Sequence, residues 1–145
     1  ERTDTPLKER VRKVNGWAKK LGSQNVVLVS IHNNAAGADD KWHSATGFSV
    51  FVSNNASSKS KKLAQIFTAN ATDMGLMGNR CVPPEKYWVQ SLAMTRDTAC
   101  PAVLTENLFQ DNEEDVKFLL SEEGKRAITT LHVNSIIQYI NTIKS

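Results

Sequence analysis

Several features that mark large classes of proteins are absent from this sequence. No apolar run approaches the roughly 18 to 20 residues of a membrane span, and no charged-then-apolar leader opens the chain as a signal peptide would. We therefore expect a soluble or already processed chain. No internal repeat or low-complexity tract is present, and 145 residues with 40% hydrophobic side chains are expected to form one domain, residues 1–145.

Cysteine is scarce, and its placement indicates little. Cys81 and Cys100 are far apart in the sequence and do not form a CxxC pair. A disulfide between them would suit an exported protein. Buried free thiols are the simpler expectation, because cysteine packs as a small hydrophobic side chain.

A large or concentrated excess of positive charge is also missing. The net charge is +3 at pH 7, and the Lys and Arg residues are spread over predicted helix faces. Nucleic-acid binding would need a concentrated basic stripe with an aromatic platform, so we expect no nucleic-acid partner. A polyanionic surface such as a cell wall remains compatible with this charge.

The central feature of the sequence is an apolar run that leads to a histidine. Val26-Val27-Leu28-Val29 is short, β-branched and without polar alternation, which is typical of a strand covered on both faces of a mainly parallel sheet. His32, Asn33 and Asn34 follow it closely. In open α/β sheets, ligands bind beyond the carboxyl ends of the strands, so this polar cluster is a candidate site by its position.

Helical spacing of apolar residues predicts helices around such strands. The expected helices run from Pro6, with Thr5 as N-cap, to Gly22; from Ser57 or Ser58 to Gly75; from a capping-box-like pair, Asn112 and Asp115, for a short stretch; and from Glu122 toward the C-terminus. Further strands are expected over residues 46–53, 89–94 and 102–105. The predicted fold class is α/β, with a twisted, mostly parallel sheet flanked by helices on both faces.

A second strand ends in the same way as the first. Pro101 forces an extended entry, and residues 102–105 form a short apolar strand that ends at Glu106 and Asn107. If the two strands run parallel, His32 and Glu106 lie at the same rim of the sheet.

Three stretches resemble one protein family along nearly the whole chain. They are ERTDTPLKERVRKVN, VLVSIHNNAAG and CPAVLTENLFQDNEEDVKFL. The last is the most specific, because Pro-Ala-Val-Leu is followed after one residue by Glu106, with Phe109, Asn112 and Asp115 in register. The chain is similar to the zinc-dependent N-acetylmuramoyl-L-alanine amidases, the bacterial and phage cell-wall hydrolases of the amidase-3 family. This resemblance implies a twisted mixed sheet flanked by helices.

The resemblance also implies a zinc site. In the family, two histidines and a glutamate hold Zn²⁺, and a second glutamate assists the attacking water. His32 matches one ligand histidine, and Glu106 matches the catalytic glutamate. The other ligands lie in an N-terminal part of the family domain, upstream of this chain, so the first strand or strands of the family fold are expected to be missing here. Leu108 departs from the usual glycine of the family, which affects the local loop shape.

One histidine cannot hold a catalytic zinc ion, which normally has three protein ligands and one open position. The chain is therefore expected to be incomplete as an enzyme by itself. It is interpreted as a truncated or proteolysed product completed by a separate N-terminal fragment, as a fragment, or as a degenerate module that only binds. The first two are favoured, because the strand after Asn25 otherwise lacks a neighbour and exposes an apolar edge.

Structural interpretations compete with these roles. Taken by itself, His32 is interpreted as a hydrogen-bonded histidine at a strand end. The corresponding structural interpretation of Glu106 is an acid that caps a neighbouring helix or pairs with Arg80 or Arg96. The shared rim and the family motif favour function, since a buried carboxylate needs a cationic partner and a metal ion is one. His43 follows a polar loop, which suits a metal ligand poorly. His132 is expected to be structural or exposed.

The expected function is hydrolysis of the amide between N-acetylmuramic acid and the L-alanine of the peptidoglycan stem peptide, by zinc-activated water. We expect this in the cell envelope, outside the cell or in a phage lysin. The alternative is a non-catalytic peptidoglycan-binding or regulatory module, and a weaker one is a metal-free hydrolase. Four further residues are expected to bind substrate or orient ligands, although asparagine after a strand is often a turn residue: Asn33, Asn34, Asn107 and Trp42.

Overall fold

A computed structural model describes residues 3–144 and arranges them around a four-stranded sheet. Its strands are β1 (Leu28–Asn34), β2 (Ser49–Val52), β3 (Trp88–Val89) and β4 (Ala102–Phe109), in the spatial order β1-β4-β2-β3. β1 is parallel to β4 and β2 to β3, whereas β2 and β4 are antiparallel. The sheet is mixed and mostly parallel, which confirms the predicted fold class.

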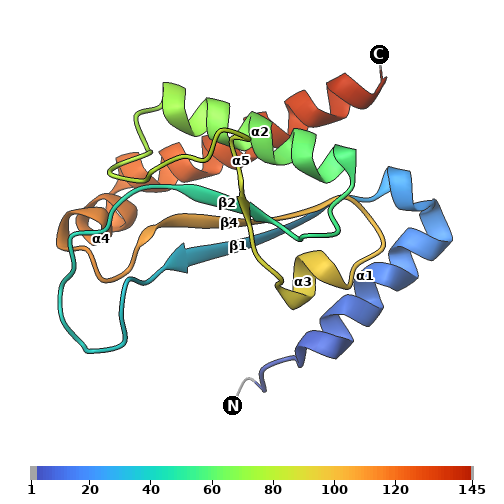
Figure 1. Ribbon diagram of the computed structural model, residues 1–145, viewed down its shortest axis with the longest axis horizontal. Helices are drawn as coiled ribbons and strands as arrows, with labels where there is room; N and C mark the ends of the chain where they lie inside the picture. Colours follow the sequence, from blue (N-terminus) through green and yellow to red (C-terminus); the bar gives the residue numbers. More distant parts are fainter. Residues whose placement is uncertain (1–2, 145) are drawn as a thin grey trace.

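Helices cover both faces of this sheet (Figure 1). They are α1 (Leu7–Leu21), α2 (Ser58–Asp73), α3 (Ala93–Arg96), α4 (Glu113–Leu120) and α5 (Glu122–Lys144), with a 3-10 turn, η1 (Ser23–Asn25), before β1. The long helices α2 and α5 lie on one face, and α1 with the short α3 lies on the other. The loop from β1 to β2 and helix α4 lie at the end of the sheet where β1 and β4 stop.

Several predicted helix ends are confirmed by their caps. The Ser57 hydroxyl accepts a hydrogen bond from the Ser60 amide at 3.1 Å, and the Asn112 side chain accepts one from the Asp115 amide at 3.0 Å. The prediction that Thr5 caps α1 is wrong. Pro6 occupies the N-cap position with an extended ψ of 147°, so the chain turns into the helix one residue later than expected.

Two strand predictions also differ from the structure. The apolar run was expected to form the strand itself, but β1 begins only at Leu28 and continues to Asn34, so the polar cluster belongs to the strand. The strand expected over residues 89–94 is wrong, because β3 ends at Val89. Residues 93–96 turn into α3, where the Leu92 carbonyl accepts hydrogen bonds from the Thr95 and Arg96 amides.

The core lies between the sheet and the α2 and α5 layer. Its fully buried side chains come from β2 and the residue before it, α2, β4 and α5, and include Phe48, Val50, Val52, Leu63, Phe67, Val103 and Leu131. Both cysteines are free thiols; Cys100 is buried as expected and Cys81 is exposed, which the sequence did not predict. Among residues 3–144, no helix is long and apolar enough to span a membrane.

Candidate active site

His32 and Glu106 are direct neighbours across two strands. Their Cα atoms are paired in the parallel ladder between β1 and β4. Because paired residues in a ladder project to the same face of a sheet, the imidazole and the carboxyl group extend from one face, near the carboxyl ends of both strands. The prediction that the strands run parallel and bring His32 beside Glu106 is confirmed. The prediction that each strand ends at these residues is wrong, because β1 continues to Asn34 and β4 to Phe109.

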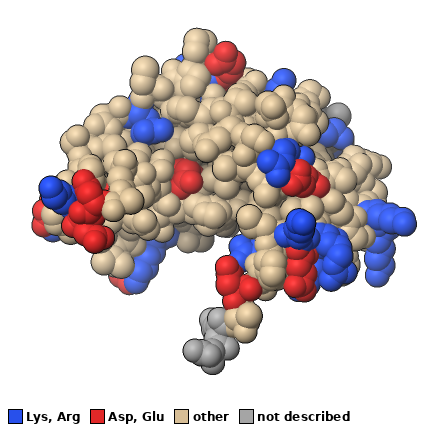
Figure 2. Space-filling view, turned by 60° about the horizontal axis from the view of Figure 1, so that its bottom comes forward, with Lys and Arg blue, Asp and Glu red and all other residues tan. Residues whose placement is uncertain are grey.

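The face that carries His32 and Glu106 is opposite to the main core. Ser49 of β2 pairs with Glu106 and therefore belongs to the same face. Thr105 and Asn107, the neighbours of Glu106 along β4, point toward α5, where Thr105 contacts His132. Figure 2 brings the α1 side of the molecule forward; the centre of that surface is mostly uncharged, and Lys and Arg residues gather over α1.

A β-bulge adjusts the end of β4. His32 pairs with Glu106 and Asn34 with Phe109, so two steps on β1 correspond to three on β4. Phe109 thereby returns to the face of Glu106. Leu108 absorbs the extra residue with φ of 63°, a left-handed conformation that favours glycine, and its side chain is buried in the core. The departure from the family's glycine at this position therefore coincides with the bulge.

Glu106 lies in a partly desolvated environment. Burial raises the pKa of its carboxyl group, and the positive charge of Arg80 partly opposes this increase. Its Oε2 atom is buried and has no hydrogen-bond partner within residues 3–144. Of the two arginines proposed as its partner, Arg80 is thus the one whose charge acts on Glu106.

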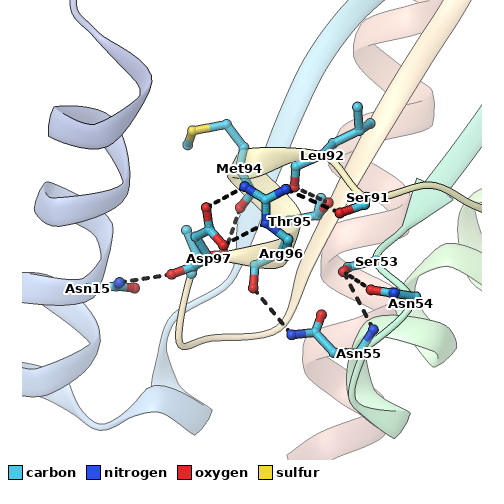
Figure 3. A network of polar contacts seen from close by, with 11 residues as sticks. Asn15, Ser53, Asn54, Asn55, Ser91, Leu92, Met94, Thr95, Arg96 and Asp97 are labelled. Carbon is cyan, nitrogen blue, oxygen red and sulfur yellow. Dashed lines mark hydrogen bonds and ion pairs between the residues drawn. The ribbon is translucent and has the colours of Figure 1, made fainter.

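Arg96 is occupied elsewhere, as Figure 3 shows. Its guanidinium forms a bidentate pair with Asp97 at 2.7 and 2.8 Å and donates a further hydrogen bond to Ser91. The carbonyl of Asp97 accepts a hydrogen bond from Asn15, and that of Arg96 accepts one from Asn55. Arg96 therefore helps to attach α3 to α1 and to the segment after β2.

His32 is exposed, and local hydrogen bonds position it. The Ser30 hydroxyl lies 2.9 Å from Nε2 of its ring. The Asn107 side chain donates to the His32 carbonyl at 3.0 Å, and the Asn33 side chain donates to the Asn107 carbonyl at 2.9 Å. Hydrogen bonds that fix the ring and its backbone are what a ligating histidine requires.

The predicted substrate-binding residues lie in different environments. Asn107 is only 1% exposed, which favours the orienting role and leaves it no surface for a substrate. Asn34 accepts a hydrogen bond from the Ala35 amide, as a turn residue does. Trp42 is 58% exposed and lines a cavity of about 490 Å³, together with Lys41, Gln110 and Asp111. This cavity lies just beyond the carboxyl ends of β1 and β4.

The other two histidines do not join this site. His43 pairs with Asp39 at 2.7 Å, and this hydrogen bond raises the pKa of His43. His132 is buried against Phe67, and its ring bonds to the Ile128 carbonyl and the Thr105 hydroxyl, so its predicted structural role is supported. In the described part of the chain, no group of three or more His, Cys, Asp or Glu side chains is placed to hold a metal.

A catalytic zinc ion needs more ligands than His32 and its neighbours provide. The exposed imidazole of His32 fits one ligand position, and the Glu106 carboxylate with its unpaired oxygen lies on the neighbouring strand beside it. Zinc in catalytic sites takes three protein ligands, so residues 3–144 do not hold it by themselves.

Sequence reasoning missed three residues around the site. Ser49 was hidden in a strand pattern, and Arg80 was considered only as an ion-pair partner. Asp115 was interpreted as part of a cap, but its buried carboxylate also accepts hydrogen bonds from the Thr46 hydroxyl and the Gly47 and Phe109 amides. It therefore fastens the end of β4 to the segment before β2. The Asn112-x-x-Asp115 spacing was the available signal, but it indicated only a helix start.

Comparisons with known proteins agree with this architecture. A family model described as N-acetylmuramoyl-L-alanine amidase matches residues 1–138. The endolysin of Bacillus phage SPP1 is 26% identical over 95% of the chain, and the chain spans 46% of that endolysin, about half its length.

Solved structures give the same result for the fold. The N-acetylmuramoyl-L-alanine amidase from Clostridium difficile 630 superposes with a TM-score of 0.76 at 23% identity, over 96% of this chain and 67% of that one. The apo form of the amidase Ami1 from Mycobacterium abscessus superposes with a TM-score of 0.79 at 21% identity, over 97% and 64%. At these identities the likeness concerns the fold.

Proposed function

Because the chain belongs to the N-acetylmuramoyl-L-alanine amidase family, we propose that it acts in cleaving the amide between N-acetylmuramic acid and the L-alanine of the peptidoglycan stem peptide. The observation that supports this best is the pairing of His32 with Glu106 on one face of the sheet. These are the positions that resemble a zinc ligand and the catalytic glutamate of the family.

In this proposal Glu106 is the general base and then the general acid. Its carboxylate takes a proton from the attacking water and returns a proton to the leaving nitrogen of L-alanine. The unpaired, buried Oε2 supports this role, because it is an acceptor that no protein donor within residues 3–144 occupies. His32 acts as one ligand of the metal, with its backbone held by Asn107.

A bound zinc ion would lower the pKa of a water molecule and polarise the amide carbonyl. Because residues 3–144 supply too few ligands, we propose that residues 1–145 are one part of a single catalytic domain. The remaining ligands would come from a segment outside this sequence, in the same protein or in a separate N-terminal fragment. β1 is an edge strand with Ile31 61% exposed, so a further strand can add there.

We further propose that the substrate is met in the bacterial cell wall, by a secreted protein or a phage lysin. The similarity to a phage endolysin supports this location. Trp42 and the adjoining cavity, together with Asn33 and Asn34, lie at the correct end of the sheet to contact the glycan or the peptide.

The incomplete donor set also supports a second function, a peptidoglycan-binding module without metal. The full-length protein should be incubated with purified peptidoglycan, the soluble products identified by mass spectrometry, and the zinc content of the protein measured. If the protein is an amidase, the soluble products should be peptides that begin with a free L-alanine amine, and a chelator should abolish their release. Binding to the wall without released peptides supports the module, and release that resists the chelator supports a metal-free hydrolase.

A further inference from the structure

Arg80 lies over the same face of the sheet as Glu106. Its guanidinium carbon is 5.4 Å from the ring centroid of Trp88 and 5.3 Å from that of Phe109, both within cation–π distance. Phe109 reaches this face through the β4 bulge. Trp88 reaches it because it pairs with Phe51, whose partner on β4 is Leu104. Two aromatic side chains from different strands thus hold one cation beside the candidate site.

Three buried polar atoms on this face of the sheet, one of them in the Arg80 guanidinium, have no hydrogen-bond partner within residues 3–144. They are Nε of Arg80, Oε2 of Glu106 and Oγ of Ser49. Ser49 and Glu106 are paired across β2 and β4, so both side chains belong to the face that Arg80 covers. A donor, an acceptor and a hydroxyl that are all unsatisfied on one face of a sheet are unusual in a folded protein, where buried polar groups are normally paired.

A purely structural role explains Arg80 poorly. The ion pairs of the described chain do not include it, in contrast to Arg96, which is paired with Asp97. A guanidinium held by aromatic rings is already oriented and keeps its charge and its planar set of donors for another group. Such a fixed donor stabilises a charge that develops in a reaction without first having to reorganise.

We propose that Arg80 is a catalytic residue of the proposed amidase, where it donates to the carbonyl oxygen of the scissile amide as that oxygen becomes negatively charged. This inference rests on the proposed function. A substrate carboxylate is a less suitable partner, because the negative charge of Glu106 on the same face would repel it. A neutral amide carbonyl avoids this repulsion in the bound substrate and gains the attraction to Arg80 only in the transition state.

The water oxygen forms a bond to the carbonyl carbon while one water proton passes to Glu106, and the π electron pair of the carbonyl moves onto its oxygen, facing Arg80. The pair then returns to re-form the carbonyl and the carbon–nitrogen bond breaks. The nitrogen takes the proton from Glu106, which returns to its carboxylate form. The products are the carboxylic acid of the muramoyl group and the free amine of L-alanine. Arg80 keeps its protons throughout.

The test compares Arg80→Gln, Arg80→Lys and the matched control Arg96→Gln in the full-length protein on a soluble muramoyl peptide. Loss of one oxyanion donor typically lowers kcat by about 10²- to 10³-fold, so Arg80→Gln should show such a decrease with a nearly unchanged KM. Arg80→Lys keeps the charge but not the planar donors and should fall between, and Arg96→Gln should retain the wild-type kcat.

A second measurement separates catalysis from folding. Binding of a phosphinate analogue of the muramoyl peptide, which carries the transition-state charge, should weaken in Arg80→Gln and Arg80→Lys much more than binding of the uncleaved peptide. Equal weakening of both ligands, a change in KM alone, or a wild-type kcat in Arg80→Gln would overturn the inference. If the wild-type protein releases no peptide with a free L-alanine amine, the proposed function fails. Analogue binding that still depends on Arg80 would then show that the fault lies in the proposed function and not in the role of Arg80.

Discussion

The two faces of β4 differ in how their polar groups are satisfied. Toward α5, the Thr105 hydroxyl contacts the His132 ring and accepts from Asn107, whose amide also reaches the His32 carbonyl. The Asn107 Oδ1 atom is unpaired in this chain of contacts, and the buried Tyr139 hydroxyl of α5 also has no partner within residues 3–144. On the opposite face, Glu106, Ser49 and Arg80 each keep a buried polar atom without a partner in the described structure.

This difference separates a folding role from a chemical one along a single strand. A satisfied polar network in the interior fixes the position of a strand, whereas unsatisfied groups cost stability unless they meet a ligand. The α5 face therefore holds the site in place, and the Glu106 face is available for chemistry. Substitutions on the two faces should consequently affect different measurements.

The largest effect is expected on the chemical face. Glu106→Gln removes the base but keeps the shape, so peptidoglycan hydrolysis should fall by about 10²- to 10⁴-fold, while the thermal midpoint stays the same or rises because a partly buried charge is lost. Glu114→Gln, on the exposed face of α4, is the control and should remain fully active. Retained hydrolysis in Glu106→Gln would remove this residue from the mechanism.

The next effect belongs to the folding face. Thr105→Val keeps the side-chain shape but leaves the His132 ring and the Asn107 amide with one partner fewer, which should lower the free energy of unfolding by roughly 1–3 kcal/mol in urea denaturation. Thr129→Val, whose hydroxyl makes only an exposed bond within α5, should change stability much less. Equal effects of the two substitutions would show that the buried network has no special weight.

A smaller effect should appear in the pH dependence of stability. Burial lowers the pKa of His132 below its usual value of 6.5, so between the two values the unfolded chain binds more protons than the folded one. The free energy of unfolding should therefore decrease as pH falls below 6.5, and this slope should shrink in His132→Gln. Its neighbours Thr105, Phe67 and the Ile128 carbonyl are uncharged. An unchanged slope would assign the pH dependence to other groups.

The smallest effect is expected at the edge of the site. Trp42→Ala should raise KM for a muramoyl peptide several-fold with kcat and the thermal midpoint nearly unchanged, because Trp42 is exposed and lines the cavity beyond β1 and β4. Trp17→Ala on α1 is a matched control, since Trp17 is 57% exposed and Trp42 58%. A similar KM in both variants would place the substrate elsewhere.

The sequence predicted the parts of this comparison that depend on local pattern. Apolar runs and caps located β1, β4 and most helices, and an ionisable residue followed by asparagine after each apolar run placed His32 beside Glu106. The contents of the two faces were not predictable in this way. The bulge at Leu108 and the contacts of Arg80 with Trp88 depend on register and on a loop whose sequence has almost no periodicity. Burial of Asn107 depends on α5, which is distant in sequence.

The metal content of two histidine variants tests the central claim most directly, which is that His32, beside Glu106, is a ligand of the catalytic zinc ion. His32→Ala and His43→Ala should be prepared in the full-length protein, with zinc supplied, and their bound zinc measured by mass spectrometry. The account predicts that His32→Ala loses zinc and that His43→Ala keeps the wild-type content. Full zinc content in His32→Ala, or its loss in His43→Ala, would contradict it.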